Sequence, residues 1–261
     1  MAALTETQVI LGWRESGFSR GSAAVSARRS GRACFRGPKS EIQNLKSKID
    51  MGLYSKYIFP RLLDWGLGDS ITQSKRREAL ASVRGNVLEV GFGTGLNLPH
   101  YPKHLTKLTA VEPVRMLKDR VERRIAEAGM PVEQIHLDAS GRLPLDDQSF
   151  DFVVTTFTLC SISDVAGALG EMRRVLKPEG RYVFLEHGRS DDPRVAKRQD
   201  FFNPVQRIIA CGCNINRAID RLIRESGFDL TELDRYVMPE TPRMLGEMYR
   251  GSARKAGGRA G

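Results

Sequence analysis

Three glycines on alternate positions, Gly91, Gly93 and Gly95, follow a short apolar run that begins at Val87. Glycine has no β-carbon and adopts positive φ angles at little cost, so alternate glycines let a ligand approach the backbone in a sharp turn. A strand that ends in such a loop, followed by a helix whose first amides face outward, is a common way for an α/β sheet to hold a nucleoside-type ligand. These residues therefore predict a nucleoside-binding loop with a helix after it.

Two carboxylates follow later apolar runs, where a second and a third strand would end. Glu112, with Pro113 after it, ends the run 108–111, and an acidic residue about 20 positions beyond the glycines can accept both ribose hydroxyl protons. Asp138, with Ala139 after it, ends the next run and can accept a hydrogen bond from an adenine amino group. The spacing predicts that both carboxylates bind the same nucleoside.

The rest of the chain continues the alternation of apolar runs and amphipathic segments. Gly227 is placed to end the last helix. The elements expected are a fourth strand at 150–156, a helix end, turn and fifth strand within 175–185, a helix at 215–226, and a final antiparallel pair at 228–237 and 248–253.

From about residue 77 to residue 255 the chain resembles the class I S-adenosylmethionine-dependent methyltransferases. That family has E/D-x-G-x-G-x-G on the first strand, an acid on the second, an acid after the third and an L-K-P-x-G turn before the fifth, and all four occur here in order. The resemblance implies an α/β fold with a Rossmann-like, seven-stranded, mostly parallel sheet, helices on both faces and an antiparallel last strand. It implies S-adenosyl-L-methionine as cofactor, bound by Glu89, Gly91, Gly93, Gly95, Glu112, Pro113, Asp138, Ala139 and Thr156.

A nicotinamide or flavin dehydrogenase is the competing interpretation of the glycine-rich loop. Its fingerprint, G-x-G-x-x-G, needs glycine at position 96, where this chain has Leu96. A pyrophosphate also favours an amide-rich helix start, whereas S-adenosylmethionine has no phosphate and needs only a looser turn. The sequence therefore favours S-adenosylmethionine.

Within that family, the run 155–164 resembles the thiol S-methyltransferases and their bacterial relatives. Those enzymes share a T-x-x-L-C-S-V run, an E-H pair at the end of the fifth strand, here Glu186-His187, and a later G-C-N-x-x-R segment, here 212–217. The resemblance implies in-line methyl transfer to a small molecule, best a thiol or other apolar acceptor. Two alternatives stay open: a quinone-precursor C-methyltransferase with the same motifs, and a noncatalytic cofactor-binding protein of this fold.

His187 and Glu186 are the candidate catalytic residues. A thiol, with a pKa of about 8.5, ionises with little help, whereas a phenol, amine or activated carbon needs a proton acceptor. His187, with a reference pKa of about 6.5, is the candidate base, and Glu186 its orienting group or alternative. An equally weighted interpretation is that His187 only packs against the substrate or binds its edge.

Residues 200–209 are expected to be an insertion that covers the active site. Phe201 and Phe202 are predicted to line an apolar pocket there. The expected partner is a small-molecule methyl acceptor.

The chain has four cysteines: Cys34, Cys160, Cys211 and Cys213. The Cys211-Gly-Cys213 pair lacks a second pair and has no histidine near it in the sequence, so no metal site is predicted. Reduced thiols in a cytoplasmic protein are expected. Cys160 is predicted to be a small buried residue.

The formal net charge of +10 is concentrated at the two ends of the chain. Residues 1–50 carry net +5 and residues 250–261 net +4, which leaves +1 for the body, so no nucleic-acid partner is predicted. Residues 1–40 are predicted to be a disordered basic extension, with a transit peptide, or a start codon at Met51, as alternatives. Residues 256–261 are expected to be a frayed tail.

Segment 41–76 is predicted to form N-terminal helices before the methyltransferase domain, 77–255, with a break ahead of Pro60. These helices either pack on the sheet or form a lid over the substrate, with Tyr54 and Tyr57 facing the ligand. Weak contact with a membrane surface is a third interpretation. No apolar run approaches the roughly 20 residues that a membrane span needs.

Overall fold

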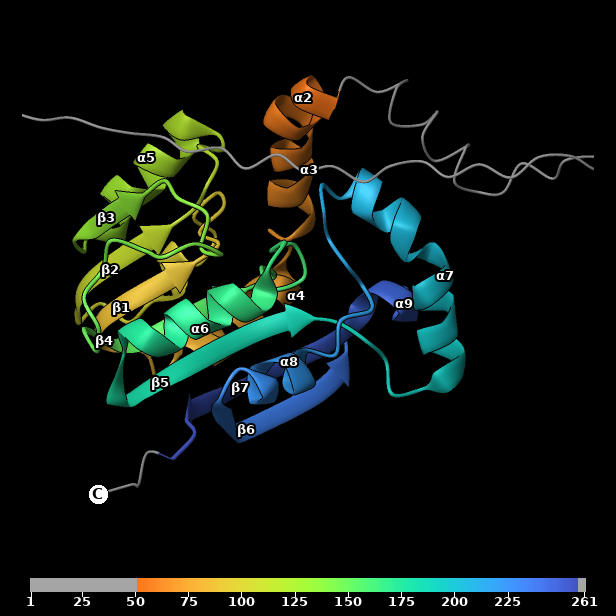
Figure 1. The fold of residues 1–261 in the computed structure, drawn as a ribbon. Helices are drawn as coiled ribbons and strands as arrows, with labels where there is room; N and C mark the ends of the chain where they lie inside the picture. Colours follow the sequence, from red (N-terminus) through yellow and green to blue (C-terminus); the bar gives the residue numbers. More distant parts are fainter. Residues whose placement is uncertain (1–50, 258–261) are drawn as a thin grey trace, which may run out of the picture. The chain divides into compact units, whose positions relative to one another are not determined.

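The computed structural model describes residues 51–257, and the strands among them form a single sheet (Figure 1). The strands are β1 (Gly85–Val90), β2 (Leu105–Val111), β3 (Val132–Ile135), β4 (Phe150–Thr156), β5 (Leu176–His187), β6 (Phe228–Val237) and β7 (Glu247–Lys255). Within the described residues the sheet has seven strands in the order β3-β2-β1-β4-β5-β7-β6. The strands from β3 to β5 pair in parallel, and β7 runs antiparallel to both of its neighbours. The predicted fold class is confirmed.

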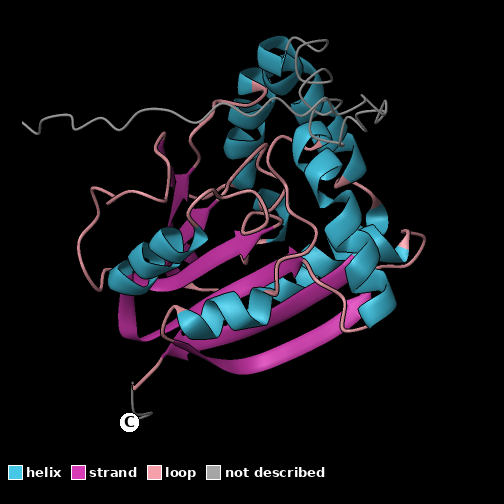
Figure 2. Ribbon diagram, turned by 45° about the vertical axis from the view of Figure 1, so that its right-hand side comes forward, coloured by secondary structure: helices cyan, strands magenta, loops and turns pink. Residues whose placement is uncertain are grey.

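Helices cover both faces of the sheet, as Figures 1 and 2 show. Neighbouring residues of a strand point to opposite faces, so Val87 packs against one layer and Leu88 against the other, both fully buried. The layer at Val87 contains α4 and α5, and the layer at Leu88 contains α6 and α8. The helical elements are α2 (Met51–Leu53), the π-helical turn η1 (Tyr54–Ile58), α3 (Phe59–Gly66), α4 (Ser70–Leu80), the 3-10 helix η2 (Leu98–His100), α5 (Lys118–Ala128), α6 (Val165–Val175), α7 (Pro193–Ile209), α8 (Ile219–Glu225) and α9 (Arg243–Gly246).

The prediction of a helix directly after the glycine loop is wrong. Residues 96–104, all of which the structure describes, contain the short η2 and no α-helix. Pro99 fits the first turn of a helix, but Pro102 has no N–H to continue one, and β2 begins at Leu105. Prolines thus end the helical conformation after one turn.

The prediction of a turn before the fifth strand is also wrong, because residues 177–180 already belong to β5. The register against β4 moves from Phe150 opposite Leu176 to Phe152 opposite Arg181. The extra residues of β5 are therefore accommodated as an irregularity of the strand. The last predicted helix exists as α8 but begins later than expected, at Ile219.

The break predicted ahead of Pro60 does not occur, since residues 51–66 are helical throughout. Pro60 lies in the first turn of α3, directly after η1. A proline has no N–H to donate, and the first turn of a helix is where that donor has no intrahelical partner anyway. The wider η1 turn thus precedes a proline that the helix tolerates.

Several predictions fall on residues that the structure does not describe. The basic extension at 1–40, the start of the 41–76 segment and residues 258–261 of the predicted tail lie outside the described residues. Among residues 51–257, no helix has the length and apolar character to cross a bilayer.

Asp64 ties α3 to the glycine loop and to α5. Its carboxylate accepts hydrogen bonds from Thr94 Oγ1 and from Arg124 Nη1, each at 2.6 Å, and pairs with Arg120. Burial favours the neutral acid, but the bonds from Arg124, Thr94 and Arg120 outweigh it and hold the pKa of Asp64 below its usual value. The carboxylate is buried, so α3 is held in place by a buried acid whose arginine partners reach the surface.

We expect Asp64→Ala to lower the free energy of unfolding by about 2 kcal/mol, because the substitution removes the hydrogen bonds of a buried carboxylate to Thr94 and Arg124, and hydrogen bonds to a charged group contribute roughly 1.5 to 3 kcal/mol. Urea unfolding measures this loss. Glu133→Ala is the matched control, since Glu133 pairs with Lys107 where both side chains are about half exposed, and it should cost less than about 1 kcal/mol. Equal losses would show that the Asp64 contacts do not hold α3.

Candidate functional site

A cavity of about 1620 Å³ opens at the carboxyl ends of the central strands. This is the edge at which open α/β sheets bind ligands. One wall is the glycine loop with the residues after β2 and β3, a second is η1 and α3, and a third is the end of α7 with the residues that follow it. Figure 1 shows α3 and α7 beyond the arrowheads of these strands.

The glycine loop has the backbone geometry that its sequence predicts. Gly91, Gly93 and Gly95 have φ angles of +80°, +57° and +79°. A β-carbon on Gly91 would lie 2.1 Å from Thr158 Oγ1, so close packing there excludes any side chain. A β-carbon on Gly93 would meet no atom within 4 Å, because that side of the loop is open. Gly91 and Gly93 line the cavity, so the loop leaves room for a ligand against its backbone.

Glu112 faces the same cavity from the end of β2, together with Pro113. Its Oε2 accepts a hydrogen bond from the Gly93 amide at 2.9 Å, and its Oε1 accepts one from the Val114 amide at 3.3 Å. Burial raises the pKa of Glu112, and the two amide bonds oppose that rise. The carboxylate is thus fixed next to the glycine loop, where ribose binding stays a prediction.

Asp138 and Ala139 line the cavity from the segment after β3. Asp138 Oδ1 accepts a hydrogen bond from the Ser140 amide at 2.8 Å, a local turn that holds the carboxylate in place. The structure therefore brings to one cavity the two carboxylates that the sequence predicts as ligands of a nucleoside.

A buried polar network lies beneath the glycine loop. Glu89 Oε1 accepts a hydrogen bond from Asn97 Nδ2, and Glu89 Oε2 accepts one from Tyr101 Oη, both at 2.8 Å. Thr156 Oγ1 accepts from Arg76 Nη1 at 2.8 Å and from Asn97 Nδ2 at 3.0 Å. Burial raises the pKa of Glu89 to about 7 and lowers that of Arg76 to about 10. Glu89, Thr156 and Arg76 also line the cavity.

Sequence reasoning missed Arg76 and Asn97. Arg76 stands among the charged residues 75–78, yet only 3% of it is exposed. Its Nη1 donates to Asn97 Oδ1 at 2.7 Å. A polar side chain at position 97, two residues after the last glycine, was the available signal.

His187 and Glu186 end β5 and point in different directions, as neighbours in a strand must. His187 lines the cavity. Glu186 is fully buried, and its Oε2 accepts hydrogen bonds from the amides of Thr158 at 2.8 Å and Leu159 at 3.2 Å. Burial raises the pKa of Glu186 to about 8. Glu186 thus positions the loop after β4, and the role of His187 as a base stays a prediction.

Cys160, His187 and Cys213 form a cluster in the wall of the cavity. Their ligand atoms all lie within 4.8 Å of one another, and Cys213 Sγ is 3.2 Å from His187 Nε2. No metal site was predicted, because no histidine lies near Cys213 in the sequence. In the structure, however, the fold brings residues from three distant segments together, and the prediction that they bind no metal stays untested. Cys160 is buried as predicted, with 2% of it exposed.

Each member of this cluster changes the acidity of the others. The hydrogen bond from Cys213 is the main cause of a pKa well below the usual value for Cys160, and His187 adds to it against the effect of burial. The pKa of Cys213 is raised by the same contact. Burial lowers the pKa of His187, but the charge of Cys160 outweighs burial and raises it. The cluster therefore favours a thiolate at Cys160.

The aromatic residues of η1 and α7 lie only in part where the sequence predicted them. Tyr54 lines the cavity, and its hydroxyl donates to Ile209 O at 2.8 Å, which joins the two walls. Tyr57 is exposed, and Phe201 and Phe202 are 77% and 45% exposed, so the prediction that these phenylalanines line an apolar pocket is wrong. Residues 193–209 form a helix, and its pitch turns residues 201 and 202 outward. The lid role of the N-terminal helices stays a prediction.

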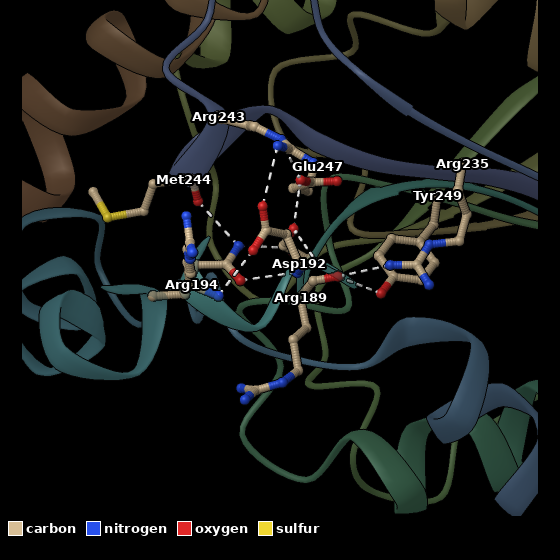
Figure 3. A network of polar contacts seen from close by, with 11 residues as sticks. Arg189, Asp192, Arg194, Arg235, Arg243, Met244, Glu247 and Tyr249 are labelled. Atoms are coloured by element: carbon tan, nitrogen blue, oxygen red, sulfur yellow. Dashed lines mark hydrogen bonds and ion pairs between the residues drawn. The ribbon is translucent and has the colours of Figure 1, made fainter. Parts of the chain in front are cut away.

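Beyond His187 a polar network fixes the path of the chain into α7 (Figure 3). Arg189 O accepts hydrogen bonds from Arg235 Nη2 at 2.9 Å and from Tyr249 Oη at 2.5 Å. Asp192 caps α7 by accepting from the Arg194 amide at 2.9 Å, and it pairs with Arg243 at 3.3 Å. The end of β5 and the start of α7 are thus held to β6, β7 and α9.

Comparison with known proteins places this geometry among methyl-transferring enzymes. Residues 88–184 match the family model described as "Methyltransferase domain". The chain is similar to the thiol S-methyltransferase TMT1B of Rattus norvegicus, with 30% identity over 175 residues that cover 62% of this chain and 70% of the relative. It is also similar to a phosphatidylethanolamine N-methyltransferase of Cereibacter sphaeroides, with 27% identity over 72% of this chain and 89% of the relative.

The fold has a solved counterpart with a bound ligand. The 1,6-didemethyltoxoflavin-N1-methyltransferase of Burkholderia thailandensis, solved with its substrate and S-adenosylhomocysteine, matches with a TM-score of 0.57 and 16% identity. The match covers 89% of this chain and 93% of that chain. At this identity the likeness concerns the fold alone.

We expect Glu112→Ala to weaken binding of S-adenosylmethionine about 10- to 100-fold, because a hydrogen bond to a charged group contributes roughly 1.5 to 3 kcal/mol. Isothermal titration calorimetry measures the affinity. Glu122→Ala, which removes an exposed acid on α5, is the control and should leave the affinity unchanged. If both variants bind like the wild type, the ribose assignment of Glu112 is wrong.

We expect the contribution of Glu89 to the free energy of unfolding to fall as the pH rises. Burial raises its pKa from 4.5 to about 7 in the folded state, so its contribution is complete below the unfolded value and is lost as the pH rises through the folded value. Between about pH 5 and pH 8 we expect the wild type to lose roughly 2 kcal/mol through this group. Unfolding of wild type and Glu89→Gln, measured across this range, gives the difference. A parallel pH dependence of the two proteins would contradict the assignment.

Proposed function

The chain belongs to the class I S-adenosylmethionine-dependent methyltransferases, and from this premise we propose that it methylates a small, apolar molecule at a thiol. The cofactor of the enzyme is S-adenosyl-L-methionine. When bound, that cofactor supplies a methyl group on a sulfonium, so transfer forms a bond from the acceptor sulfur to the methyl carbon and breaks a carbon–sulfur bond whose electron pair stays on the cofactor sulfur. The protein itself must hold the cofactor and select the acceptor.

The residues around the glycine loop fit this cofactor. The open side of Gly93 leaves room for a nucleoside beside the backbone, with Glu112 and Asp138 on the same cavity. We assign the ribose to Glu112 and the adenine to Asp138 with Ala139. Glu89 and Thr156 hold the loop from below through Asn97, so they act on the cofactor by positioning.

The observation that carries the proposal is the continuity of the cavity from the glycine loop to an apolar region beside His187. Several apolar side chains at its rim are exposed, among them Leu62 at 51%, Trp65 at 82% and Ile209 at 50%. Exposed apolar groups around a cavity are typical of a binding site for an apolar ligand. They also exclude water once the ligand covers them.

Three points support a thiol as the reacting group. A thiol ionises at a pKa of about 8.5, so its transfer needs little basic help. Glu186, the other candidate base, binds two backbone amides and does not line the cavity. The similarity to a thiol S-methyltransferase points to the same acceptor class.

A quinone precursor is the second candidate acceptor. The cavity volume of about 1620 Å³ has room for an aromatic ring with an apolar tail besides the cofactor. Methylation of a ring carbon needs a proton acceptor, and His187 is the titratable group that would supply it. The cytoplasmic location, the absence of a nucleic-acid partner and a weak membrane contact stay predictions.

Incubation with methyl-labelled S-adenosylmethionine tests the proposal, with hydrogen sulfide, alkyl thiols, phenols and demethylated quinone precursors as acceptors. We expect labelled thioether from the apolar alkyl thiols. Label in a ring methyl group would favour the quinone alternative. Label in none of the products, from protein that binds the cofactor, would reject both.

A pair of substitutions on α7 tests where the acceptor binds. Ile209 lines the cavity and Val205 does not, although both are exposed. We expect Ile209→Asp to raise the KM for an apolar thiol about 10-fold, the effect of losing roughly 1.5 kcal/mol of apolar contact. Val205→Asp should leave this KM unchanged. Equal effects would place the acceptor elsewhere.

A further inference from the structure

The cluster of Cys160, His187 and Cys213 has the composition of a metal site. We propose that these three side chains bind one Zn²⁺ ion and that its fourth position, open to the cavity, takes the sulfur of the acceptor. The second part rests on the proposed function, whereas the metal site itself does not.

The distances suit a tetrahedral ion. With Zn–S bonds of about 2.3 Å and Zn–N bonds of about 2.0 Å, a tetrahedral ion separates its sulfur and nitrogen ligands by about 3.5 Å and two sulfurs by about 3.8 Å. Cys213 Sγ and His187 Nε2 are 3.2 Å apart, and all three ligand atoms lie within 4.8 Å of one another. The Sγ–Nε2 separation lies within a few tenths of an ångström of the tetrahedral value, and the other two separations need to contract by about 1 Å at most.

The chemistry of the donors selects the metal and the type of site. Thiolate and imidazole ligands favour zinc over the hard cations magnesium and calcium, which bind to oxygen. Structural zinc sites use four protein ligands, whereas catalytic ones keep three and leave a position for a water or substrate. Two cysteines and one histidine beside a ligand cavity match the second type.

Backbone hydrogen bonds hold the two cysteine segments together. The Asn214 amide and Asn214 Nδ2 both donate to Cys160 O at 2.9 Å, which joins the loop after β4 to the loop after α7. Arg217 binds Leu159 O and also Ile162 O, the latter at 2.8 Å. Such bracing orients the ligand atoms before any ion binds.

The turn that presents Cys213 uses an unusual backbone. Cys211 has a φ of +46°, which is rare for a residue with a side chain, and Gly212 follows with +102°. The Cys213 amide then donates to Ala210 O at 3.0 Å. A left-handed residue next to a ligand cavity is a frequent sign of a functional constraint, and here it directs the Cys213 side chain toward His187.

The charges balance for a zinc ion with an exchangeable ligand. On binding, Cys213 loses one proton to solvent and the Cys160–His187 pair loses another, so the ion with its two thiolates and the neutral His187 has no net charge. The acceptor R–SH then loses its proton to solvent and binds to the ion as a thiolate. After methylation the product is a neutral thioether, a weaker ligand that leaves the ion. His187 acts in this scheme as a ligand through Nε2, not as a base.

Metal analysis of the full chain, purified without chelator, tests the site directly. We expect one zinc ion per chain, and about 100-fold weaker zinc binding or more in Cys160→Ser, His187→Asn and Cys213→Ser, because each loses one of three protein ligands. Cys211→Ser is the matched control, since Cys211 lines the same cavity two residues away. Cys34→Ser controls for the remaining thiol. Thermal unfolding and S-adenosylhomocysteine binding establish that each variant is folded.

Cobalt in place of zinc then reports on the fourth position. We expect an alkyl thiol to change the thiolate-to-cobalt charge-transfer band, and the corresponding thioether to leave it unchanged. A wild-type chain without metal, a Cys160–Cys213 disulfide in its place, or undiminished binding in Cys213→Ser would overturn the metal site. A cobalt spectrum that no thiol changes would overturn the acceptor position. Metal binding without any thiol methylation would reject the proposed function and leave the metal site standing.

Discussion

The hydrogen-bond network that joins Arg76 and Glu89 through Asn97 is the interaction on which the cofactor half of the site depends. Both side chains are almost fully buried, and an isolated charge there would be costly. Asn97 donates to Glu89 and accepts from Arg76, so both buried groups have a hydrogen-bond partner in the same side chain. This network joins α4, β1, the glycine loop and, through Thr156, the end of β4. The loop can be open at Gly93 because polar contacts beneath it fix its backbone.

The acceptor half is built on a different kind of contact. The Glu186 carboxylate accepts hydrogen bonds from two backbone amides of the loop after β4, those of Thr158 and Leu159. These bonds fix the loop and so place Cys160 beside His187. Burial of Glu186 makes its neutral form favourable near neutral pH, which avoids an unpaired charge under the cavity. Neighbouring positions on the strand thus have different roles: His187 faces the cavity, and Glu186 supports the loop.

Sequence patterns predicted the parts of the molecule that depend on local periodicity. The strands at 150–156 and 228–237 have the predicted bounds, and the glycine loop with Glu112 and Asp138 lines one cavity as its spacing implied. The helix after the loop failed because Pro102 stopped it, an effect that periodicity does not register. The cysteine cluster could not be predicted, since Cys160, His187 and Cys213 are far apart in the sequence and meet only through strand order.

Strand order also explains why the two halves differ in chemistry. The chain builds the sheet outward from β1 in one direction through β2 and β3, then returns to place β4 and β5 on the other side. Strand ends on the first side carry Glu112 and Asp138, whereas the second side carries Cys160 and His187. The reversal between β1 and β4 opens the crevice where such sheets bind ligands. The carboxylates, which suit a sugar, therefore come from strands on one side of the crevice. The sulfur ligands, which suit a soft metal, come from the other side, and the two sets face each other across it.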